Sequence, residues 1–88
     1  MILSDEEKII LKNLPLKYKW IARDKNGDLN LYETKPTKSV GAGYWATDNY
    51  QDFNFYGHLF SEIKWENEGP TKILDIIDEA QIAGLDGV

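Results

Sequence analysis

Apolar side chains recur at helical spacing near the start of the chain. The stripe comprises Ile10, Leu11 and Leu14. Before it, the Ser-Asp-Glu-Glu sequence of residues 4–7 has the form of a capping box, in which each end of the motif binds a backbone amide of the other. Pro15 disfavours a helical conformation at the residue before it. We therefore predict a helix over about residues 5–14.

A second helical pattern lies near the end of the chain. Five apolar residues fall on one face: Ile73, Ile76, Ile77, Ala80 and Ala83. Pro70 suits the first position of a helix, where its missing N–H has no cost, and Gly84 suits the left-handed residue after the last turn. The pattern predicts a helix over about residues 70–83 and a tail over 84–88.

Between the two helices, hydrophobic and polar residues alternate with a period of two on both sides of Asn26-Gly27, a strong turn signal. This predicts a hairpin over about residues 17–35, ended by Pro36. If Asn26 and Gly27 alone form the turn, Ala22 pairs with Leu31 and Trp20 with Glu33. The buried face of the hairpin would then comprise Trp20, Ala22, Leu29 and Leu31.

The middle of the chain has a less regular pattern. Residues 35–39 are interpreted as a basic connector, 44–47 as a third strand, and 48–52 as a turn or one helical turn capped by Asp48. The aromatic residues over 53–60 keep no clean period, whereas residues 62–66 alternate and predict a fourth strand. We expect one α+β domain over residues 1–88, a three- to four-stranded antiparallel sheet with an N-terminal and a C-terminal helix packed on one face.

Composition excludes several classes of site. The 88 residues contain no cysteine and one histidine, so a thiolate site, a disulfide and a two-histidine metal site are excluded. No apolar run approaches the roughly 20 residues of a membrane span, and no signal segment is recognised. We expect a cytoplasmic protein without a cofactor or a metal ion.

Three groups of residues have side chains suited to catalysis or metal binding, and each has a simpler structural interpretation. The segment 24–28 resembles the start of a calcium loop, but positions six and twelve are Leu29 and Lys35 instead of glycine and glutamate. His58 lies among aromatic residues and is interpreted as half-buried filling, without a partner for acid–base work. The carboxylates of Glu62, Glu66 and Glu68 are interpreted as the solvated face of the fourth strand. We do not expect an enzyme.

Charge is unevenly distributed along the chain. Residues 1–47 carry eight basic and six acidic side chains, and residues 48–88 carry two basic and nine acidic ones, giving −5 overall. Two nucleic-acid hypotheses follow. A basic strand face could bind single strands through Lys17, Lys19 and Arg23. An acidic array could mimic nucleic acid in a cationic groove. Its candidates are Glu66, Glu68, Asp75, Asp78 and Glu79.

Protein contact is the leading hypothesis. Exposed aromatic residues are expected near Tyr44, Trp45 and Tyr50. The predicted C-terminal helix also has more large apolar residues than one narrow stripe needs, and Ile82, Leu85 and Val88 could complete a homodimer contact.

Two stretches of the sequence, Tyr18–Pro36 and Leu59–Thr71 with the lone Trp45 between them, resemble small uncharacterised proteins of phages and prophages in Gram-positive bacteria. That family has no established activity, so the resemblance implies no functional residue. It implies an accessory protein made in an infected or lysogenic cell, with an unidentified host or phage protein as partner. The alternative is the nucleic-acid-related role, either as an acidic mimic that inhibits a host enzyme or as a weak single-strand binder.

Overall fold

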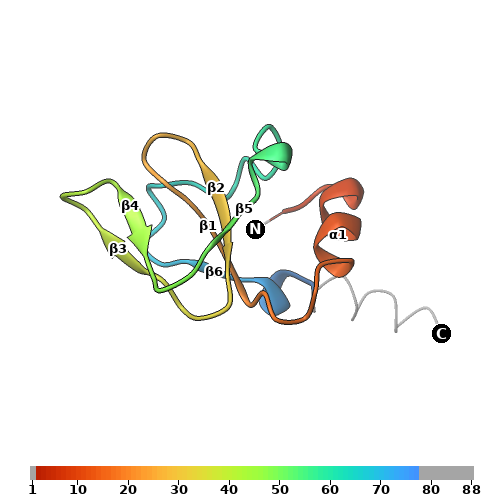
Figure 1. Cartoon of the computed structure of the whole chain (residues 1–88). Coiled ribbons are helices and arrows are strands. Elements are labelled where there is room, and N and C mark those ends of the chain that lie inside the picture. Colours follow the sequence, from red (N-terminus) through yellow and green to blue (C-terminus); the bar gives the residue numbers. More distant parts are fainter. Residues whose placement is uncertain (1, 78–88) are drawn as a thin grey trace.

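A four-stranded antiparallel sheet forms the centre of the computed structural model, which describes residues 2–77 (Figure 1). Its strands, in spatial order, are β5 (Gln51–Asp52), β2 (Leu29–Tyr32), β1 (Trp20–Arg23) and β6 (Thr71–Lys72). The other elements are α1 (Asp5–Lys12), the hairpin of β3 (Thr37–Ser39) and β4 (Tyr44–Ala46), and the short 3-10 helix η1 (Asn54–Tyr56). Residues 73–77 are also helical. The predicted α+β class, with a four-stranded antiparallel sheet and a helix near each end, is confirmed.

The N-terminal helix follows from its capping chemistry. The Ser4 hydroxyl accepts from the amide of Glu7 at 3.1 Å, and the Glu7 carboxylate accepts from the amide of Ser4 at 2.8 Å. The predicted capping box is therefore confirmed. The helix ends at Lys12, two residues before the predicted boundary, and the amide of Asn13 bonds back to the last turn.

The C-terminal helix begins later than predicted. Pro70 precedes a strand rather than opening the helix, because residues 71 and 72 pair with β1 as β6. The amide of Ile73 still donates to the carbonyl of Lys19 at 2.9 Å, and residues 73–77 are helical. The rest of the predicted helix, residues 78–83, and the predicted tail, 84–88, lie outside the described residues.

The loop of the β1–β2 hairpin is longer than predicted by one residue. The amide of Asp24 donates to the carbonyl of Asp28 at 2.8 Å, so residues 25–27 form a three-residue loop. Gly27 has a φ of 99°, the left-handed conformation that closes this type of loop. The two-residue turn expected from Asn26-Gly27 is therefore wrong.

This extra loop residue changes the register of the hairpin. The observed pairs are Trp20 with Tyr32, Ile21 with Leu31, Ala22 with Asn30, and Arg23 with Leu29. The predicted pairs, Ala22 with Leu31 and Trp20 with Glu33, are wrong. Because side chains alternate between faces, a shift of one residue moves every β1 side chain to the opposite face relative to β2.

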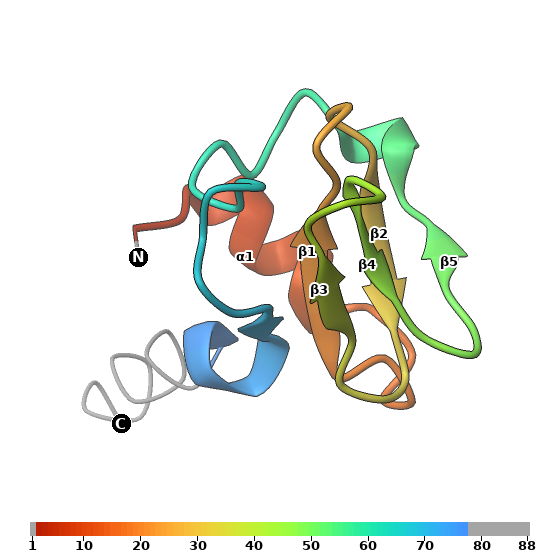
Figure 2. The ribbon, with the colours of Figure 1, turned by 90° about the vertical axis from the view of Figure 1, so that its left-hand side faces the viewer.

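Both faces of the sheet are consequently covered. On the face toward α1, the main cluster includes Leu11, Ile21, Leu29, Leu31, Phe60, Ile63 and Ile73. On the other face, Ala22, Tyr32 and Trp45 form a second cluster with the half-buried Trp20 and Trp65. Figure 2 shows β3 and β4 crossing in front of β1 and β2, with α1 behind them. The expectation that Trp20, Ala22, Leu29 and Leu31 share one face is wrong, but all four lie in or against a core cluster.

The middle of the chain departs most from prediction. Residues 37–39 of the expected connector form β3, which pairs with the expected strand at 44–46. Residues 51–52 of the expected turn form β5. Residues 62–66, expected as a strand, form turns, although Ile63 in this segment is buried. Among residues 2–77, no helix is long and apolar enough to cross a membrane.

Candidate functional site

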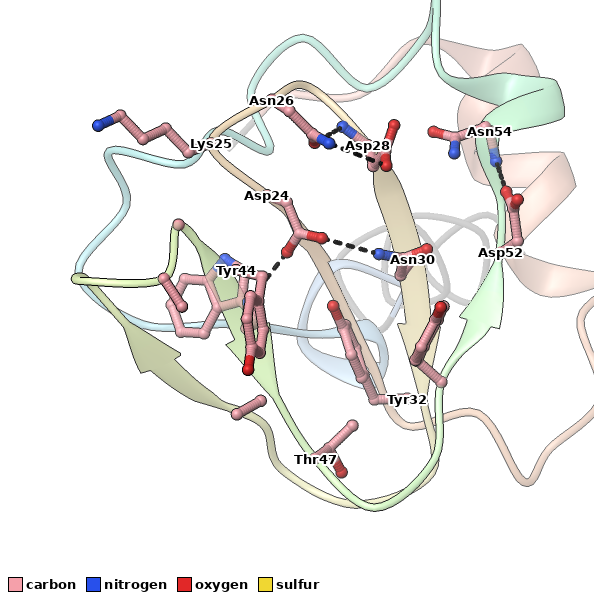
Figure 3. A pocket seen from close by; sticks show the side chains of 15 residues that line it. Asp24, Lys25, Asn26, Asp28, Asn30, Tyr32, Tyr44, Thr47, Asp52 and Asn54 are labelled. Carbon is pink, nitrogen blue, oxygen red and sulfur yellow. Dashed lines mark hydrogen bonds between the residues drawn. The ribbon is translucent and has the colours of Figure 1, made fainter.

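A cavity of about 740 Å³ lies between the β3–β4 hairpin and the β2 and β5 strands of the sheet (Figure 3). Its volume falls within the roughly 300–1,000 Å³ typical of ligand pockets. Its lining comes from the β1–β2 loop, from β2, from residues 42–46 of the β3–β4 hairpin and from residues 47–54. Segments far apart in the sequence therefore build it. The observed register of β1 and β2 puts Asn30 and Tyr32 on the side of the sheet where the cavity lies.

Asp24 connects the two walls of the cavity. Its carboxylate accepts from the amide of Trp45 at 2.9 Å and from the Asn30 side-chain amide at 3.3 Å. The Trp45 indole donates in turn to the carbonyl of Arg23 at 3.0 Å. Burial raises the pKa of Asp24, with a smaller contribution from the charge of Asp28, while the Trp45 amide acts in the opposite direction. The carboxylate is therefore held in place but poorly solvated.

Tyr32 contributes a buried hydroxyl. The residue is only 1% exposed, and its hydroxyl has no hydrogen-bond partner among the described residues. Figure 3 shows the ring rising from β2 with its hydroxyl toward Asp24 and Asn30. Burial, together with the nearby charge of Asp24, raises the pKa of Tyr32 to about 12, although the side chain of Asn30 close by acts in the opposite direction. A buried hydroxyl without a partner costs about 1–3 kcal/mol of stability.

The rim of the cavity is aromatic and acidic. Tyr44 and Tyr50 are 49% and 68% exposed. Asp28 and Asp52 are exposed carboxylates, whereas Lys25 is the cation of the lining and extends away from Asp24 in Figure 3. The lining therefore combines flat aromatic surfaces with an excess of negative charge.

Three residues predicted for protein contact meet at this cavity: Tyr44, Trp45 and Tyr50. Trp45 is buried, however, at 5% exposure, and so it supports the wall of the cavity rather than offering a free ring. Asn30 and Tyr32 were not predicted for this site, because the two-residue turn expected from Asn26-Gly27 puts them on the other side of the hairpin.

The predicted basic face does not form as one surface. Lys17 and Lys19 are exposed, with the Lys19 ammonium donating to the carbonyl of Leu16 at 2.8 Å. Arg23 instead lies on the α1 side of the sheet, since it pairs with Leu29. Its guanidinium donates to carbonyl oxygens of Gly27, Gly57, Leu59, Phe60 and Ile63. These contacts occupy the group that was expected to bind phosphate.

The predicted acidic array is described only in part. Glu66, Glu68 and Asp75 are exposed. Asp78, Glu79 and Ile82 lie outside the described residues, as do Leu85 and Val88 of the predicted homodimer contact.

The remaining sequence candidates have structural roles or none. His58 is exposed in a turn, not half-buried as expected. The segment 24–28 forms the hairpin loop, in which the amide of Gly27 donates to the carbonyl of Asp24 at 2.9 Å. Within residues 2–77, no cluster of three histidine, aspartate or glutamate side chains is arranged to hold a metal ion.

A comparison with protein-family models, curated proteins and solved structures found no match to this chain. The cavity is therefore interpreted from its own residues.

Proposed function

We propose that the chain is a non-enzymatic binding protein that acts by contact with another protein, centred on the cavity beside Tyr44 and Tyr50. The observation that carries this proposal is the pair of exposed tyrosine side chains at the rim of a cavity of about 740 Å³. Tyrosine supplies a large contact area with a polar end, and it is enriched at protein interfaces. A concave surface with such a rim suits a protruding segment of a partner.

The character of the cavity supports binding more than catalysis. The carboxylate of Asp24 is held by two amide donors that position it. His58, the single histidine of the chain, is not among the residues that line this cavity. The other titratable groups of the lining are carboxylates, tyrosine hydroxyls and the ammonium of Lys25. The resemblance to phage and prophage proteins adds a context, in which the partner is a host or phage protein in the cytoplasm.

A nucleic-acid-related role is the second candidate, in the form of an acidic mimic. The exposure of Glu66, Glu68 and Asp75 favours it, because a mimic must present carboxylates to a cationic groove. Single-strand binding has less support, since the guanidinium of Arg23 is already bound to backbone carbonyls.

The experiment compares variants in affinity capture from host cells, with each retained protein quantified. Replacing Tyr44 and Tyr50 with alanine should reduce a retained partner at least tenfold. The matched control replaces Leu16 and Phe55 with alanine. These side chains are 87% and 84% exposed and do not line the cavity, so this variant should retain the partner. Equal loss in both double variants would contradict a contact at the cavity.

A charge-reversal variant addresses the second candidate. Changing Glu66 and Glu68 to lysine should leave a cavity-bound partner in place, because neither residue lines the cavity. Loss of the partner in this variant, with retention in the tyrosine variant, would favour the acidic mimic over the cavity.

A further inference from the structure

We propose that the cavity receives an arginine side chain from a basic segment of the partner protein, with its guanidinium between the Asp24 carboxylate and the Tyr32 hydroxyl. The inference rests on the proposed function for the place of contact. It adds the chemistry of the group that enters.

The first argument is that Asp24 and Tyr32, which we call the floor of the cavity, can form further hydrogen bonds. The Tyr32 hydroxyl is buried and has no partner among the described residues. The Asp24 carboxylate accepts two bonds, from the Trp45 amide and the Asn30 side chain. A carboxylate has about four acceptor positions, so further donors can be bound there. Acceptor positions therefore remain open on the Asp24 carboxylate and on the Tyr32 oxygen, where a ligand N–H could donate.

The second argument is the excess of negative charge in the lining. Asp24, Asp28 and Asp52 line the cavity, and the ammonium of Lys25 extends away from the floor. Burial makes the charge of Asp24 costly in the free protein. A cation that reached this carboxylate would offset that cost, whereas a phosphate or carboxylate ligand would add to it. The protein as a whole, with a net charge of −5, also favours a basic partner.

The shape of the lining selects among cations. A guanidinium is planar and carries five N–H donors in a fixed fork, so it can bond to Asp24 and Tyr32 together. An ammonium has three donors on a single nitrogen, and a quaternary ammonium has none. The exposed tyrosine rings of the rim offer flat surfaces on which a guanidinium stacks.

The size of the cavity indicates a segment of chain rather than a free amino acid. Its volume of about 740 Å³ is in the range that holds a drug-sized ligand, and so exceeds one side chain. The rim tyrosines can then contact the backbone beside the arginine. A neutral ligand rich in hydroxyls would use the same aromatic surfaces and could donate to the carboxylates, but it would not offset their negative charge.

The test uses hexapeptides that differ only at one central residue: arginine, citrulline, lysine or trimethyllysine. Binding is measured by calorimetry and by the NMR shift of the Trp45 indole N–H. Citrulline has the shape of arginine without its charge. We expect the arginine peptide to bind at least tenfold more tightly than the other three, and more tightly than arginine amide alone. Equal affinities of the arginine and citrulline peptides, or no binding up to millimolar concentration, would overturn the proposal.

Two variants locate the contact. Asp24→Asn keeps an oxygen for the Trp45 amide but removes the charge, and Tyr32→Phe removes only the hydroxyl. Each should weaken the arginine peptide at least fivefold, while the controls Glu68→Gln and Tyr56→Phe, which do not line the cavity, should leave its affinity unchanged. An unchanged affinity in both cavity variants would place the guanidinium elsewhere and refute the proposal.

A separate measurement tests the unpartnered hydroxyl. Because the Tyr32 hydroxyl has no hydrogen-bond partner within residues 2–77, Tyr32→Phe should not lower the denaturation midpoint of the free protein. A lowered midpoint would mean that the hydroxyl is bonded within the protein, which would remove the first argument above.

The two proposals fail in different ways. If the Tyr44 and Tyr50 variant loses a captured partner but arginine has no advantage over citrulline, the contact site stands and its occupant is wrong. If arginine amide binds as tightly as the peptide, the cavity recognises a small molecule and the protein segment is refuted.

Discussion

Replacing Arg23 should destabilise the protein far more than replacing any other basic residue of the predicted nucleic-acid face. Its guanidinium donates at 2.8–3.3 Å to four carbonyls of the segment 57–63 and to the carbonyl of Gly27. That segment forms turns and has no neighbouring strand within residues 2–77 to donate to these carbonyls, although the Phe60 carbonyl also accepts from the amide of Ile63. Arg23 therefore takes the place of a neighbouring strand for this part of the chain.

The size of the effect follows from these contacts. The four bonds to segment 57–63 lie in a partly buried environment, and each is expected to contribute about 0.5–1 kcal/mol net. Arg23→Met should therefore lower the free energy of unfolding by about 2–4 kcal/mol, a large fraction of the roughly 5–15 kcal/mol of a typical domain. Arg23→Lys keeps the charge but not the planar fork of donors, and should still cost about 1–2 kcal/mol.

The assay is urea denaturation followed by tryptophan fluorescence, with Lys17→Met as the control. Lys17 is exposed, and its ammonium lies 5.2 Å from the Tyr18 ring centroid, so its loss should cost less than about 0.5 kcal/mol. A cost for Arg23→Met as small as that of Lys17→Met would refute the structural role of Arg23. It would also return Arg23 to the candidates for phosphate binding.

Three further changes test other parts of the fold. Gly27→Ala should lower the free energy of unfolding by about 1–2 kcal/mol. The cause is its φ of 99° alone, since an added Cβ would meet nothing within 4 Å. Thermal unfolding measures the loss, and the control Gly69→Ala, whose added Cβ also meets nothing within 4 Å, should leave the stability unchanged. Lys38→Met should lower the free energy of unfolding by about 1–2 kcal/mol in the same assay. Its ammonium lies 4.6 and 5.1 Å from the ring centroids of Trp65 and Trp45 and donates to backbone carbonyls. The control Lys35→Met, with one ring centroid at 5.6 Å, should cost less than about 0.5 kcal/mol. Partial burial opposes ionisation of Glu7, but hydrogen bonds from backbone amides outweigh it and lower the pKa of Glu7. The ionised carboxylate therefore stabilises the fold fully above its ordinary pKa of 4.5, and this stabilisation is lost as the pH falls through the lowered pKa. Glu7→Gln should therefore flatten the acid side of the stability–pH curve, and an unchanged slope would contradict this assignment.

Local chemistry explains what the sequence could predict. The capping box at residues 4–7 needs only neighbours along the chain, and the helix that it predicts is present. The hairpin was found for the same reason, because alternation and a glycine turn are local signals. The fold class followed from the order of these elements.

The failures share a different cause. Residues 62–66 alternate like a strand, but Arg23, some 40 residues away, binds the carbonyl of Ile63, and the segment forms turns instead. Residues 37–39 are short and polar on their own, and become a strand only because β4 returns to pair with them. Contacts of this kind cannot be read from a local pattern.

The cavity depends on the outcome of one such ambiguity. With a two-residue turn, Ala22 would have faced Leu31, and the ring of Tyr32 would have been on the same side of the hairpin as Ile21. The three-residue loop instead pairs Ala22 with Asn30 and puts Tyr32 on the side of the β3–β4 hairpin. The buried Tyr32 hydroxyl thus reaches the cavity because of the loop closed by Gly27. The position of Tyr32 and Asn30 beside Tyr44 therefore depends on two features that no local pattern fixes, the length of the β1–β2 loop and the return of the β3–β4 hairpin over that side of the sheet.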